Sequence, residues 1–138
     1  MINNHSKLYL ITLIVISLLS CNSLRTDADI FGNWEGNYND HELLFAFKTD
    51  NTCVLIYFDK QVNKFETISG SFELDFSKKP IALSIRDISQ LNHPLYTIIE
   101  FITKDSIRIS EFSPKWRLRP ISFETGKTIN LKRIQIPE

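Results

Sequence analysis

Hydrophobic and polar residues alternate along most of the chain beyond residue 30, and Gly, Pro, Asn or Asp interrupts the alternation at short intervals. Residues 72–76 (Phe-Glu-Leu-Asp-Phe) show the pattern clearly. A period of two places one face of an extended strand against a core and the other face in water. No stretch in this region has the period of an amphipathic helix. The pattern predicts eight strands, at residues 32–39, 43–49, 52–58, 65–76, 81–86, 95–103, 106–112 and 128–134.

Eight short antiparallel strands with short connections favour an all-β fold in which one sheet closes on itself as an up-and-down barrel. Closure removes the exposed sheet edges, and a barrel of eight strands is either filled by side chains or holds one small ligand. A β-sandwich is the alternative. Gly70 lies inside the fourth predicted strand, where a glycine indicates a bulge or a sharp bend.

Two functions are compatible with such a barrel. The first is non-enzymatic binding of a small apolar ligand in the interior. The second is a filled barrel that acts as a protein-interaction or inhibitor module through its loops. The loop at residues 115–119 is the candidate contact surface, because Trp and Arg are frequent binding anchors; its candidate residues are Lys115, Trp116, Arg117 and Arg119. The candidate ligand-lining residues are Phe45, Phe47, Leu55, Tyr57, Phe72 and Leu74.

The N-terminal pattern is different, because residues 8–19 form an almost unbroken apolar run after the single basic residue Lys7. This run has the length of a signal-peptide core and is shorter than a helix that spans a bilayer. Ser20 is the small residue expected before a cleavage point. The run Leu-Leu-Ser-Cys at residues 18–21 resembles the bacterial lipobox, and the resemblance implies a signal peptide at residues 1–20 and a lipidated Cys21. An ordinary secretory signal and a retained membrane helix are the alternatives.

Lipidation of Cys21 would place the protein in the bacterial cell envelope. A lipoprotein cysteine carries two or three acyl chains, and two chains already anchor a protein stably. Asn22 follows the cysteine, where Asp would favour retention at the inner membrane, so we expect the outer membrane. Residues 22–29 are polar and aperiodic and predict a tether. A single domain then occupies residues 30–138.

Composition argues against several other functions. The chain has 16 basic and 16 acidic residues, whereas nucleic-acid binding requires a basic surface. Once Cys21 is modified, only Cys53 remains, so no disulfide is expected, and a cysteine within an apolar strand behaves as a small hydrophobic residue. Neighbouring side chains at residues 40–42 (Asp-His-Glu) point in different directions and cannot surround one metal ion. No catalytic motif is present, so we expect neither an enzyme nor a cofactor.

Four segments carry a resemblance to a known family. Residues 32–36 (Gly-Asn-Trp-Glu-Gly) resemble the Gly-x-Trp start of lipocalins. Residues 70–80, together with Arg-Pro at 119–120 and Leu-Lys-Arg at 131–133, are similar to a bacterial family of lipocalin-like secreted proteins. The resemblance covers residues 32–133 and implies an up-and-down barrel without an established activity. The long helix that precedes the last strand region in lipocalins has no counterpart here.

The resemblance also implies a role for two residues at the ends of the domain. Lipocalins close one barrel end by laying an Arg of the last strand across the Trp of the first, and Trp34 and Arg133 are the matching residues. A guanidinium over an indole ring contributes about 0.5–2 kcal/mol. The alternative is that Trp34 is an ordinary core residue with no Arg partner.

We predict that Cys21→Ser releases the protein from the membrane fraction or leaves it unprocessed, because the substitution removes the atom that carries the acyl chains. Fractionation of cells and the mass of the chain measure both outcomes. Unchanged fractionation together with unchanged processing would contradict lipidation.

Overall fold

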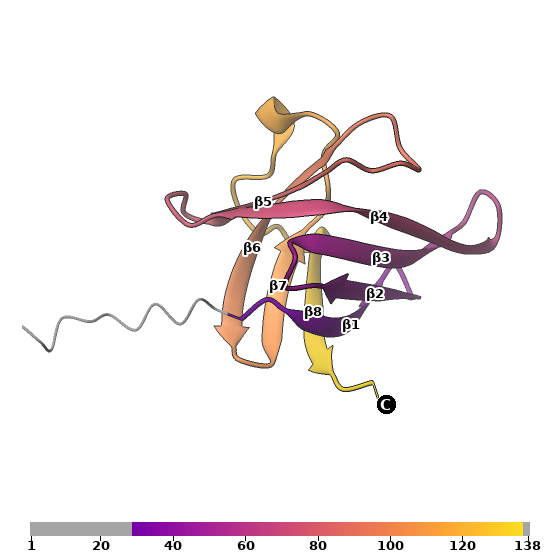
Figure 1. The fold of residues 1–138 in the computed structure, drawn as a ribbon, viewed down its shortest axis with the longest axis horizontal. Coiled ribbons are helices and arrows are strands. Elements are labelled where there is room, and N and C mark those ends of the chain that lie inside the picture. Colours follow the sequence, from indigo (N-terminus) through magenta and orange to yellow (C-terminus); the bar gives the residue numbers. More distant parts are fainter. Residues whose placement is uncertain (1–28, 137–138) are drawn as a thin grey trace, which may run out of the picture.

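The computed structural model of this protein describes residues 29–136, which form a closed barrel of eight antiparallel strands in chain order (Figure 1). Among these residues, no helix is long and apolar enough to cross a membrane. The predicted signal segment, Cys21 and most of the tether lie outside the described residues. The strands are β1 (Gly32–Tyr38), β2 (His41–Phe47), β3 (Thr52–Asp59), β4 (Lys64–Asp75), β5 (Ile81–Arg86), β6 (Leu95–Thr103), β7 (Ser106–Ser110) and β8 (Thr128–Ile134), and the 3-10 turn η1 (Trp116–Leu118) precedes β8.

The predicted all-β barrel is confirmed, and the β-sandwich is excluded, because the first and last strands pair. β1 and β8 run antiparallel, with Trp34 opposite Arg133 and Gly36 opposite Leu131. Every strand therefore has two hydrogen-bonded neighbours. The architecture is the lipocalin-like up-and-down barrel that the sequence predicts.

Two strands differ from their predicted boundaries by two residues, β2 at both ends and β7 at its end, and the other strands agree within one residue. β2 begins at His41, two residues earlier than predicted, because Asn39 and Asp40 take positive φ values of 52° and 65° and form a tight hairpin turn. Asn and Asp tolerate this left-handed conformation better than most residues. β7 ends at Ser110, two residues earlier than predicted.

Two glycines allow strands to approach closely. A Cβ atom on Gly36 would lie 2.5 Å from the carbonyl oxygen of Asn130, at the seam between β1 and β8. A Cβ atom on Gly70 would lie 2.3 Å from the carbonyl oxygen of Arg86. Of the two predicted features at Gly70, a bulge or a sharp bend, the bulge is excluded, because the register between β3 and β4 continues through this residue without a shift. Close backbone approach is the reason for glycine at both sites.

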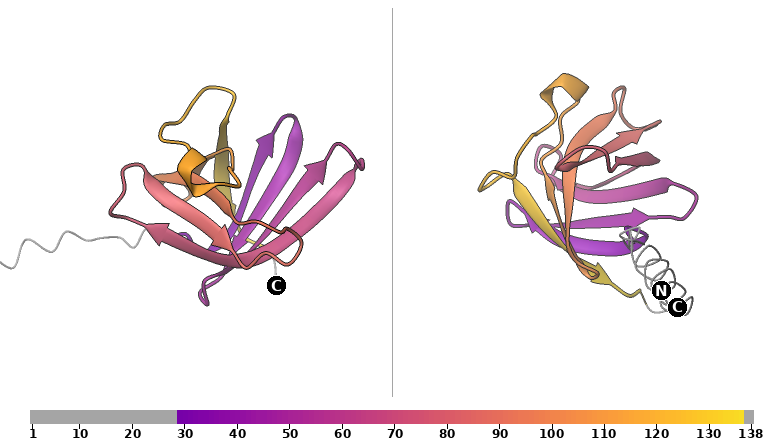
Figure 2. Two further views of the ribbon diagram at one scale, coloured as in Figure 1. Left: turned by 90° about the horizontal axis from the view of Figure 1, so that it is seen from above. Right: turned by 90° about the vertical axis from the view of Figure 1, so that its left-hand side faces the viewer.

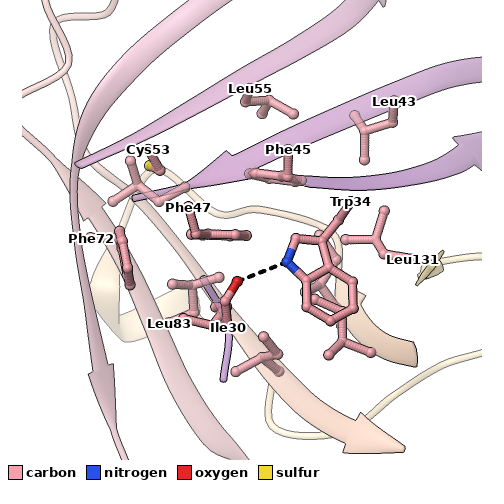
Figure 3. Close-up of a cluster of buried hydrophobic side chains, with 14 of the residues drawn as sticks. Ile30, Trp34, Leu43, Phe45, Phe47, Cys53, Leu55, Phe72, Leu83 and Leu131 are labelled. Carbon is pink, nitrogen blue, oxygen red and sulfur yellow. Dashed lines mark hydrogen bonds between the residues drawn. The ribbon is translucent and has the colours of Figure 1, made fainter. Parts of the chain in front are cut away.

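Large aromatic side chains fill one end of the barrel (Figure 3). The rings of Phe45 and Phe47 stack with centroids 5.1 Å apart, and Phe72 meets Phe47 edge-on at 5.0 Å. Trp34 is completely buried beside them, and its indole Nε1 donates a hydrogen bond of 2.8 Å to the carbonyl oxygen of Ile30. The bond satisfies the one polar atom of the ring, so its burial leaves no donor unpaired.

Arg133 covers this end of the barrel. Its guanidinium carbon lies 4.3 Å from the centre of the Trp34 ring. The guanidinium also donates hydrogen bonds to the carbonyl oxygens of Asp29, Phe31 and Lys104, and its Nε lies 3.4 Å from the Asp105 carboxylate. One side chain of the last strand therefore ties the segment before β1 to the turn between β6 and β7.

We predict that Trp34→Ala lowers the free energy of unfolding by about 3–5 kcal/mol, because it leaves a large cavity under Arg133. Trp116→Ala is the matched control: this indole is exposed, and we expect a change within about 0.5 kcal/mol. Urea unfolding followed by circular dichroism measures both values. Equal stabilities of Trp34→Ala and the unmodified protein would refute the role of Trp34 in closing the barrel.

Candidate functional site

An apolar pocket opens at the end of the barrel opposite Trp34 and Arg133, with a volume of about 250 Å³. It lies between the β1–β2 hairpin, the outer ends of β3 and β4, and the loop that precedes β6. Most of its walls are hydrocarbon. The lining residues are Tyr38, His41, Glu42, Leu43, Leu55, Tyr57, Phe58, Ile68, Leu91, Leu95, Glu111, Phe112 and Ile129.

The structure places two of the six predicted lining residues, Leu55 and Tyr57, in the wall of this pocket. The three phenylalanines do not line it, because they belong to the packed aromatic end of the barrel. Leu74 packs against the core away from the pocket. The interior is thus partly filled and partly open. The six predicted residues are Phe45, Phe47, Leu55, Tyr57, Phe72 and Leu74.

Sequence reasoning missed most of the other lining residues. Tyr38, Leu43, Ile68 and Ile129 could have been found, since they continue the inward alternation toward the end of the barrel that lacks Trp34. Leu91 comes from the loop before β6, and loop conformation does not follow from strand periodicity.

Polar groups stand at the rim of the pocket. Burial raises the pKa of Tyr57, and the nearby carboxylates of Asp59 and Glu66 raise it further. Its hydroxyl therefore stays protonated at neutral pH and can donate a hydrogen bond. The Tyr38 hydroxyl lies 3.5 Å from a carboxylate oxygen of Glu111. The site can bury an apolar body while a few polar atoms orient one end of it.

No convergent metal site occurs within residues 29–136: no group of three His, Cys, Asp or Glu side chains could hold an ion. His41 instead stacks on the ring of Phe58, with centroids 4.3 Å apart. Glu42 is the next residue of β2, so its side chain leaves the strand on the opposite face.

Cys53 is buried, with an exposed fraction of 2%, and it forms no disulfide. Burial raises the pKa of its thiol to about 11. Because the thiolate is the reactive form of cysteine, this side chain is inert at neutral pH and contributes to packing.

The predicted contact loop lies outside the barrel, beside β5 and β6. Trp116, Arg117 and Arg119 line a second hollow of about 610 Å³ on this outer surface, and Lys115 is not part of its lining. Arg119 is held in place by a hydrogen bond of 2.7 Å to the Ser84 hydroxyl. The structure therefore separates an apolar site at the barrel mouth from a basic site on the outer wall.

Comparison with protein-family models, with curated proteins and with solved structures finds no match to this chain. We therefore infer its function from the geometry of these two sites.

We predict that Cys53 resists iodoacetamide at about pH 8, where an exposed thiol is partly ionised, and reacts rapidly in urea. Mass spectrometry of the peptide that contains Cys53 measures the labelling without interference from Cys21. Rapid labelling of the folded protein at this pH would contradict the burial of the thiol.

The same shift makes stability depend on pH in a defined direction. The thiol pKa is 9.0 in the reference state and about 11 in the folded protein, so the unfolded chain loses its proton first as the pH rises. The free energy of unfolding should then fall between these two pH values. Cys53→Ala should remove this part of the slope, which makes the difference between the two proteins the quantity to measure.

Proposed function

We propose that this protein is a lipid-anchored protein of the bacterial envelope that binds a small apolar ligand at the mouth of its barrel, without catalysing a reaction. The apolar pocket opposite Trp34 is the observation that carries the proposal. A lipobox-like run at residues 18–21 supports the anchor, and the resemblance of residues 32–133 to lipocalin-like proteins supports the barrel in which the ligand would bind.

The size of the pocket limits the ligand. A cavity of about 150 Å³ admits a benzene-sized molecule, and pockets for drug-sized ligands measure about 300–1,000 Å³. The pocket of about 250 Å³ lies between these ranges. It therefore suits a compact ring or a short acyl segment, and a whole phospholipid chain is too large. Tyr57 at the rim supports a ligand with one hydrogen-bond acceptor.

The second candidate is a protein-interaction or inhibitor module that acts through its loops. It is favoured by the solid packing of the aromatic end of the barrel and by the exposure of Trp116. A binding module of this type needs no open interior. The two candidates differ in whether occupation of the mouth pocket matters.

We predict that the protein extracted from its native membrane carries a small apolar molecule, detected by mass spectrometry, and that Leu55→Trp loses it. The new indole would occupy the pocket from its wall. Ile56→Trp is the matched control, because it adds the same ring at the next position of β3, outside the pocket lining. We expect it to retain the molecule.

Titration with the small fluorescent probe 1-aminoanthracene tests the pocket in purified protein that has lost its ligand. Binding that disappears in Leu55→Trp and persists in Ile56→Trp supports a ligand at the mouth. An empty native protein that also fails to bind the probe would contradict the proposal and leave the loop module as the better candidate. Near-UV circular dichroism of each variant checks that the barrel is intact.

A further inference from the structure

The chain that follows β7 covers part of the outer surface of β5 and β6. Ala82 and Ile98 point away from the core, yet both are buried. The chain after β7 covers them: Ser113 forms two backbone hydrogen bonds of 2.8 Å with Tyr96, and the chain then continues to η1. In Figure 1 and the right-hand view of Figure 2, η1 projects beyond the strands.

A hollow of about 610 Å³ remains between this covering segment and the turn that joins β4 to β5. Its floor contains Ala82, Tyr96 and Ile98, and prolines stand on both sides. Five basic side chains and one acidic side chain line it. The charged lining residues are Lys78, Lys79, Arg86, Arg117, Arg119 and Asp75.

Most of these cations lack an acidic partner. Arg86 pairs with Glu73, with 3.4 Å between nitrogen and oxygen. Within residues 29–136, Lys78, Lys79 and Arg117 form no ion pair. Asp75 is the one carboxylate in the lining, and hydrogen bonds from the Ser77 hydroxyl and backbone N–H hold it in the turn. The hollow therefore carries a net positive charge, because its five cations outnumber Asp75 and the Glu73 partner of Arg86.

Three exposed hydrophobic side chains form a rim at and beside the hollow: Trp116 and Ile121 line it, and Leu118 ends η1 between them in the chain. Trp116, Leu118 and Ile121 are 64%, 66% and 85% exposed, the three highest fractions among the large hydrophobic side chains of residues 29–136. The guanidinium of Arg117 lies 5.4 Å from the centre of the Trp116 ring. Protein surfaces that enter the headgroup region of an anionic membrane combine exposed apolar side chains with neighbouring cations, and this region has the same composition.

We propose that this hollow and its hydrophobic rim are a membrane-docking site, in which the cations bind the phosphate of an anionic lipid headgroup while Trp116, Leu118 and Ile121 enter the boundary of the acyl layer. Charge complementarity favours this occupant, because each Lys or Arg near an anionic bilayer contributes about 1 kcal/mol. The site is separate from the mouth pocket and does not depend on a ligand there, since the two share no lining residue.

The length of the N-terminal segment is compatible with this contact. The described chain begins at Asp29. Residues 22–29 can span at most about 28 Å when extended. If Cys21 is anchored in a bilayer, a chain of this length keeps the barrel close to it. The same length allows the outer surface of β5 and β6 to turn toward the bilayer. Docking would then hold the barrel in one orientation instead of leaving it free on its tether.

The test uses the mature chain, residues 21–138, with Cys21→Ser, so that binding reports the barrel surface and no acyl chain. All eight strands and the whole core lie within this chain. Vesicles of phosphatidylcholine are compared with vesicles that also contain phosphatidylglycerol, by co-sedimentation and by tryptophan emission. Trp34 is completely buried, so a blue shift on binding reports Trp116. We expect binding and a blue shift with the anionic vesicles, both weakened by salt.

Two pairs of variants locate the contact. The double substitution Lys78→Gln and Lys79→Gln should lower the vesicle partition coefficient about tenfold or more. Lys60→Gln combined with Lys132→Gln makes the same change in charge away from the hollow and should have an effect of about twofold or less, because attraction to the surface falls off within a Debye length. Ile121→Ser should also weaken binding, whereas Ile102→Ser, at an exposed site outside the hollow, should not.

Several results would overturn the proposal. The first is equal binding to neutral and anionic vesicles, and the second is an equal loss in the two lysine pairs. Quenching of Trp116 by inorganic phosphate in a protein that binds no vesicles would assign the hollow to a small anion and exclude membrane docking. None of these results bears on the mouth pocket, which the probe titration tests separately.

Discussion

The pairing of β1 with β8 is the constraint on which the rest of the structure depends. These strands are the most distant in the chain, and nothing local brings them together. Gly36 allows the backbones of β1 and β8 to approach closely. Trp34 is buried in the core beside this pairing, and the guanidinium of Arg133 covers its ring. An open sheet would expose two edges and would leave the inward side chains of both end strands in water. Closure converts eight weakly amphipathic strands into one core.

The packing of side chains at the Trp34 end of the barrel determines where a ligand can bind. Trp34, Phe45, Phe47 and Phe72 are bulky and belong to one buried cluster, so the interior at the Trp34 end is filled. Toward the other end the lining combines aliphatic side chains such as Leu43 and Ile68 with aromatic ones such as Tyr38, and it leaves an open volume. Tight packing therefore stabilises one end of the barrel while the other end stays open, which explains why only part of the interior is available.

The regular part of this fold was predictable, and the irregular part was not. Strand positions follow from period-two alternation, and the all-β barrel follows from the number of strands and their short connections. The β1–β2 turn was misplaced because the positive φ values of Asn39 and Asp40 make the hairpin tighter than composition suggests. Phe45 and Phe47 were predicted to line a ligand site, and alternation does place them inside. It cannot distinguish a packed inward position from an open one, since that depends on which side chains meet across the barrel.

The covering of β5 and β6 by the chain after β7 gives one strand two roles. On β6, Leu95 points inward and lines the mouth pocket, while the next residue, Tyr96, points outward into the basic hollow. Hydrocarbon walls favour an uncharged ligand in the first site, because a buried charge there would lose its hydration without gaining a partner. Unpaired cations favour an anionic surface at the second site. Since adjacent residues of one strand face opposite sides, the barrel can meet a membrane through its outer wall while its mouth remains free to bind a ligand.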